Sequence, residues 1–136
     1  LLVVLSPLAW LRPSRTQSGR MALRMEARRI GLAMQLAPQE WPHWLLPEPP
    51  NPCAQYHRPR RGSQPACWTY WQKTPGVWVN QWQEVCDDRI LLDYFEKLPG
   101  NVFKIEADKQ MIALYWGEKG EATVLQDIDA TLKALA

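Results

Sequence analysis

The stretch ACWTYWQKTPGVWVNQWQEV, residues 66–85, decides the predicted fold because two runs of strand-forming residues flank a tight-turn signal. Tryptophan, tyrosine and valine favour strands. Pro75 and Gly76, between the two runs, suit a turn that reverses the chain. The pattern therefore predicts a β-hairpin at the start of the domain's core.

The residues after this hairpin predict a helix, a second hairpin and a last helix. Asp87 or Asp88 is placed to cap a helix whose apolar residues recur at helical spacing. A second strand pair is expected at Val102–Glu106 and Met111–Trp116, and residues 123–136 read as an amphipathic helix. We therefore expect an α+β fold: an antiparallel sheet with two or three helices packed on one side.

The strand MIALYW, residues 111–116, is apolar on both faces. A strand with two apolar faces is expected in the middle of a sheet that is covered on both sides. The sequence therefore predicts a central position for this strand and places Trp116 in the core.

Residues 1–11, LLVVLSPLAWL, are apolar, and Arg12 and Arg15 follow at once. A bilayer-spanning helix needs about 20 residues. We interpret the segment as the end of a transmembrane helix that begins upstream, with Trp10 at the interface. The apolar region of a signal peptide and a buried core segment are the alternatives.

Residues 12–31 predict a basic juxtamembrane helix that ends at Gly31. Six arginines lie close enough to the apolar segment to hold a flanking domain in the cytoplasm: Arg12, Arg15, Arg20, Arg24, Arg28 and Arg29. The expected location is thus the bacterial inner membrane, with the domain facing the cytoplasm. The residues expected to contact anionic lipid headgroups are Arg12, Arg15, Arg20, Arg24 and Arg28. No aromatic residues interleave with this stripe as in a single-strand binder, which argues against nucleic acid as the partner.

The predicted cytoplasmic domain, residues 32–136, opens with a short strand in LAMQLAP. Residues 42–53 contain five prolines and predict an irregular loop that covers the core. A ligand for an aromatic groove is the alternative use of such a loop. The basic residues that follow, Arg58, Arg60 and Arg61, are expected in a solvated turn between strands.

No pattern of reactive side chains assigns a catalytic, cofactor-binding or metal-binding residue. A zinc site could in principle be assembled from Cys53, His57, Cys67 and Cys86. Their spacing departs from the usual zinc-ligand pattern. Thiol catalysis with His43 or His57 lacks a local signature, and no glycine-rich phosphate motif is present. The sequence thus favours a non-enzymatic protein without a cofactor, with a small metal- or thiol-dependent enzyme or a nucleic-acid-binding module as alternatives.

Trp78, Asn80 and Trp82 would share one face of an extended strand. Aromatic residues beside polar ones are common in protein interfaces, so these three residues form a possible interaction surface. The alternative is that the tryptophans fill the core of a small domain.

The order of an apolar end, Arg-Pro, an arginine-rich helix and a small domain resembles a set of membrane-anchored proteins of gammaproteobacteria of the Pseudomonas type. The stretches that carry this resemblance are LSPLAWLRPSRTQSGRMALRMEARRIGLAMQL, CAQYHRPRR, NQWQE and MIALYWGEKG. Some such proteins are named after YajC, the accessory subunit of the preprotein translocase, but similarity to YajC covers only about residues 1–30. The resemblance implies an inner-membrane protein that acts through protein contacts, with an accessory role in translocation or envelope assembly as one such function.

Overall fold

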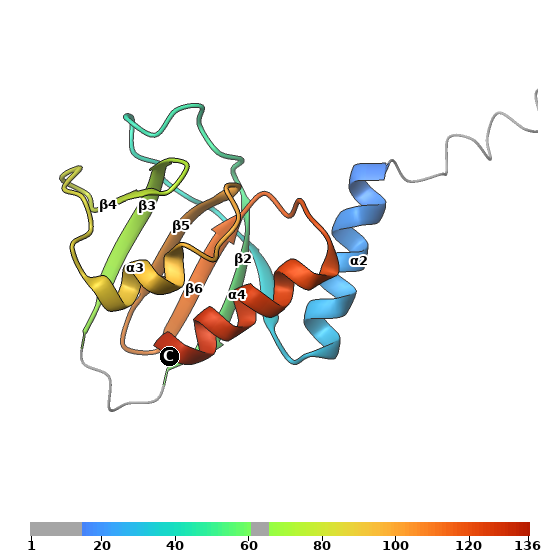
Figure 1. The fold of residues 1–136 in the computed structure, drawn as a ribbon. Helices are drawn as coiled ribbons and strands as arrows, with labels where there is room; N and C mark the ends of the chain where they lie inside the picture. The colour runs from blue at the N-terminus through green and yellow to red at the C-terminus, as the bar shows by residue number, and fades with distance from the viewer. Residues whose placement is uncertain (1–14, 61–65) are drawn as a thin grey trace, which may run out of the picture.

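The computed structural model describes residues 15–60 and 66–136, and within them six antiparallel strands form one sheet. The strand order is β1-β2-β6-β5-β3-β4. The strands are β1 (Ala33–Ala37), β2 (Cys53–Pro59), β3 (Trp68–Thr74), β4 (Val77–Val79), β5 (Val102–Ala107) and β6 (Met111–Trp116). The helices are α2 (Arg15–Arg29), α3 (Arg89–Phe95) and α4 (Ala122–Leu135). The predicted α+β class is confirmed, and Figure 1 shows α3 and α4 crossing the same face of the sheet.

Strand β6 lies between β2 and β5, in the middle of the sheet, as its two apolar faces predict. Leu114 and Trp116 belong to the main core on the helical side, whereas Ala113 and Tyr115 belong to a smaller cluster on the opposite side. Trp116 is 1% exposed and packs edge-on against Tyr56 of β2. The predicted core position of Trp116 is therefore confirmed.

Helix α3 begins where the capping signal predicts. The Asp88 side chain accepts hydrogen bonds from the backbone N–H groups of Ile90 and Leu91 at 3.0 and 3.2 Å, which satisfies two donors of the first turn. Phe95 at the end of the helix is 1% exposed and reaches the sheet. The cap and the apolar spacing together fix how α3 lies over the sheet.

The proline-rich loop and the adjacent Trp41 cover the sheet face opposite the helices. Trp41 packs edge-on against Phe103 and Tyr115 at ring-centroid distances of 6.1 and 6.4 Å. Trp44 packs in the same way on Trp71 at 5.8 Å. Because this loop buries the second face, the sheet is packed on both sides.

The sequence prediction missed strand β2. Residues expected in a proline-rich loop and a solvated turn instead form a seven-residue strand between β1 and β6. Arg58 pairs with Asp129 of α4 at 2.5 Å, and Arg60 is 8% exposed and donates to the carbonyl oxygens of Ala66 and Asp108. The solvated turn is therefore wrong for Arg58 and Arg60, because Arg58 pairs with a buried carboxylate and Arg60 is itself buried and bonded to two backbone carbonyl groups. Arg61 lies outside the described residues.

Helix α2 packs onto the domain. Leu23 and Ala27 are buried in the main core, and α2 contacts both α4 and β1. The helix starts at Arg15 and is followed by Gly31 at φ +81°, a conformation that glycine adopts readily. The predicted transmembrane segment, residues 1–11, lies outside the described residues, and none of the described helices is long and apolar enough to span a bilayer.

Candidate functional site

The predicted interaction surface consists of Trp78, Asn80 and Trp82. This prediction is wrong for Trp78. Trp78 is 2% exposed and stacks on Phe95 at 4.8 Å, whereas Trp82 is 70% exposed. The two tryptophans do not share a strand face because β4 ends at Val79. Trp78 therefore belongs to the core, and Trp82 is free to contact a partner.

Asn80 holds a tight turn that presents Trp82. Its side-chain Oδ1 accepts hydrogen bonds from the backbone N–H groups of Trp82 and Glu84, both at 3.0 Å. Gln83 has a φ of 60°, so it lies in the left-handed region at this turn. The Lys73 ammonium donates to the Gln83 side chain at 2.7 Å and ties the turn to β3. Trp82 thus projects from a turn that several hydrogen bonds hold in place.

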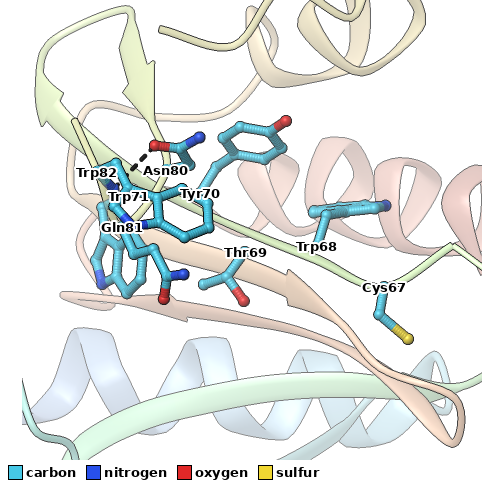
Figure 2. A pocket seen from close by; sticks show the side chains of 8 residues that line it. All are labelled: Cys67, Trp68, Thr69, Tyr70, Trp71, Asn80, Gln81 and Trp82. Atoms are coloured by element: carbon cyan, nitrogen blue, oxygen red, sulfur yellow. Dashed lines mark hydrogen bonds between the residues drawn. The ribbon is translucent and has the colours of Figure 1, made fainter. Parts of the chain in front are cut away.

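A hollow of about 350 Å³ lies between this turn and β3. Figure 2 shows Trp71, Gln81 and Trp82 gathered at one end of the hollow and Cys67 at the other. The residues that line the hollow are Cys67, Trp68, Thr69, Tyr70, Trp71, Asn80, Gln81 and Trp82. Four of these eight residues are aromatic and two carry amide side chains.

The first half of β3 borders this hollow as a sheet edge. Strand β5 pairs with β3 from Trp68 to Trp71, but β4 pairs only with Trp71, Gln72 and Thr74. Within the described chain, the residues from Trp68 to Tyr70 therefore have a strand neighbour on one side only. Backbone N–H and C=O groups of alternate residues point to opposite edges of a strand, so some of these groups face the hollow.

The aromatic side chains along this edge are held by packing on both faces of the sheet. Trp68 and Tyr70 lie on the helical side, where each packs on Phe95 at 5.8 and 5.9 Å. The ring of Trp44 packs edge-on against the ring of Trp71, and the Lys104 ammonium lies 5.7 Å from the centroid of the Trp71 ring. Figure 2 shows Trp68 and Tyr70 on one side of the strand and Thr69 on the other. A segment laid along the edge would thus meet ordered side chains on both sides.

Burial shapes the chemistry of Tyr70. Burial of the phenol, with a hydrogen bond to Cys86 and the nearby charges of Asp87 and Asp88, raises the pKa of Tyr70 to about 12. The group is therefore a neutral hydroxyl at physiological pH. Its oxygen can accept a hydrogen bond from a ligand but carries no negative charge.

The predicted lipid-contacting arginines have different environments in the structure. Arg24 forms a bidentate ion pair with Glu118, at 2.7 and 2.8 Å, so its guanidinium group has a partner within the domain. Arg20 is half-buried, and Arg28 is exposed. Arg12 and the side chain of Arg15 lie outside the described residues.

The residues considered for metal or thiol chemistry are not brought together. Among the described residues, no group of three histidine, cysteine or acidic side chains has the geometry to hold a metal ion. Cys53 and Cys86 are buried, and burial raises the pKa of the Cys53 thiol to about 11. Cys53 therefore remains a neutral thiol at neutral pH, which makes it a poor nucleophile.

A polar network that sequence reasoning missed lies under the proline-rich loop. The Tyr115 hydroxyl donates to Glu106 at 2.6 Å and accepts from the Gln55 amide at 2.6 Å. Gln55 in turn accepts from Gln35 at 2.7 Å, so the network crosses β1, β2, β6 and β5. This network was not predicted from the sequence, because its side chains are brought together only by the register of β2, the strand that the prediction missed. The network satisfies its own polar groups, and its four residues do not line the hollow beside β3.

Sequence reasoning also missed the free edge of β3. The signal was the polar pair Asn80-Gln81 after only three strand residues, since asparagine favours turns. That early turn leaves the start of β3 without a second strand neighbour in the described chain.

Comparisons of the chain with known protein families, with characterised proteins and with solved structures find no match. They neither support nor contradict the resemblance to YajC-like proteins. The candidate site therefore rests on the geometry of β3 and the Trp82 turn.

Proposed function

We propose that this chain is a non-enzymatic binding module that captures an extended segment of a partner protein along the free edge of β3. The observation that carries the proposal is the position of Trp82, 70% exposed on a hydrogen-bonded turn, beside a strand that is paired on one side only at its start. Addition of a strand to a sheet edge is a common mode of peptide recognition.

The edge matches the alternating side chains of an extended peptide. Backbone hydrogen bonds to β3 would supply affinity that depends little on sequence. Alternate peptide side chains would lie toward Trp68 and Tyr70 on the helical side, and toward Thr69 on the other side. The two sides differ in character, so they would select the peptide's register and direction.

Trp82 is the expected anchor of the interface. Tryptophan is enriched among residues that dominate binding energy, and a small set of residues usually carries most of it. Trp82 lies at the end of the hollow with Trp71 and Gln81, so a bound segment would bury its exposed ring. Because the turn is already held by Asn80, little ordering cost would accompany binding.

The proposal includes the location predicted from the sequence: the bacterial inner membrane, with the binding module facing the cytoplasm. The apolar residues 1–11 and the arginines that follow them support this part. A partner in translocation or envelope assembly would fit such a location.

The test is selection of peptides on the full chain from a displayed random library, followed by synthesis of the selected sequences. We expect Trp82→Ala to weaken their binding about 30-fold, which corresponds to the loss of about 2 kcal/mol typical of a hot-spot residue. Ile90→Ala is the matched control, because Ile90 is also exposed (68%) but lies on α3 away from the hollow lining.

Backbone N-methylation of the peptide tests the strand geometry. In an added strand, methylation should abolish binding at every second position, because only alternate N–H groups bond to β3. Equal binding by wild type and Trp82→Ala, or an N-methylation pattern without alternation, would refute the proposed site.

A further inference from the structure

Helix α2 presents an outward face that combines methionines with arginines. Met21 and Met25 are 55% and 70% exposed, and Arg28 is exposed as well. These residues follow one another at spacings of four and three, so they lie on one face of the helix. The face is therefore apolar at its centre and basic at one end.

The opposite face fixes how the helix is oriented on the domain. Leu23 and Ala27 are 2% and 0% exposed in the main core. Arg24 bonds to the buried carboxylate of Glu118, which also accepts from the Tyr56 hydroxyl at 2.9 Å. With both attachments in place, α2 cannot turn its methionines toward the domain.

Arg28 gives the outward face a positive charge that no carboxylate neutralises. Arg29 pairs with Glu26, but Arg28 forms no ion pair within the part of the chain that the structure describes. Arg20 is half-buried and its Nε is buried, so it lies beside this face and not on it. The outward face thus offers the charge of Arg28 to an anionic partner.

We infer that α2 lies flat on an anionic membrane surface, with Met21 and Met25 entering the interfacial layer and Arg28 meeting headgroup phosphates. Apolar side chains flanked by basic ones are typical of interfacial helices, and each basic residue adds attraction to anionic lipid. The inference rests on the membrane location in the proposed function: residues 1–11 end four positions before α2 begins, so α2 would start close to the bilayer.

The experiment places an environment-sensitive fluorophore on the full chain at Met25→Cys or, as a control of equal exposure, at Ile90→Cys. Exposed Cys67 is first replaced by serine, and the buried thiols of Cys53 and Cys86 are checked to remain unlabelled. Each protein is mixed with vesicles of phosphatidylcholine alone or with added phosphatidylglycerol. Flotation of the vesicles reports whether the chain is bound at all.

We expect the Met25 label to shift to the blue and brighten severalfold on vesicles with phosphatidylglycerol, while the Ile90 label stays unchanged. Arg28→Glu should reduce the Met25 response. If the chain floats with the vesicles but the Met25 label stays in water, the inference fails and the membrane location stands. If the chain does not float with either vesicle, both fail.

Discussion

At the scale of single residues, the eight tryptophans of this chain divide between stability and recognition. Trp116 is 1% exposed in the central strand, and Trp82 is 70% exposed on a turn. We predict that Trp116→Ala lowers the free energy of unfolding by about 3–5 kcal/mol, because truncation leaves a large cavity. Trp82→Ala should change it by no more than about 0.5 kcal/mol. Urea titrations followed by circular dichroism measure both, and a stable Trp116→Ala protein would show that the core lies elsewhere.

At the scale of elements, the ion pair between Arg24 and Glu118 attaches α2 to the sheet. We predict that Glu118→Gln lowers the free energy of unfolding by about 1–3 kcal/mol, less than for a fully buried pair because the Arg24 side chain is 38% exposed. In the Glu118→Gln protein, exchange of backbone amide hydrogens should become faster in α2 than in the wild type, with a smaller change in β6. Glu26→Gln is the control, because its pair with Arg29 lies on the surface and should contribute little. Equal exchange in the two variants would contradict this attachment.

Elements with a strong local signal were predicted from sequence, and those that depend on distant partners were not. The Asp88 cap and the apolar spacing of α3 are local, as are the paired strands around residues 107–111. Strand β2 has no such signal, because Gln55 and Arg58 look solvated until their partners Tyr115 and Asp129 are known. The ion pair between Arg24 and Glu118 was not predicted for the same reason.

The candidate site was partly predictable. The aromatic composition indicated a surface near Trp82, but the burial of Trp78 depends on packing against Phe95 from another element. The edge of β3 became visible only with the strand order, because a free edge is a property of the sheet as a whole.

At the scale of the whole molecule, the net charge changes sign along the chain: residues 1–61 hold nine arginines and three glutamates, and residues 62–136 hold seven basic and eleven acidic residues. Positive residues beside an apolar segment are retained in the cytoplasm. We predict that a reporter fused after Ala136 is active when it requires the cytoplasm and inactive when it requires export. Replacing Arg12, Arg15 and Arg20 with glutamine should weaken this preference. Activity of an export-dependent reporter on the unaltered chain would contradict the orientation.

The order of the strands separates the two proposed surfaces. Helix α2 lies next to β1 at one end of the sheet, and the Trp82 turn follows β4 at the other (Figure 1). Five inter-strand spacings of about 4.8 Å put roughly 24 Å between these ends. If α2 lies on a bilayer, the fold holds the free edge of β3 at a fixed distance from the lipid headgroups. A partner that also diffuses along the membrane would then be met in two dimensions instead of three, which raises its local concentration without any additional contact.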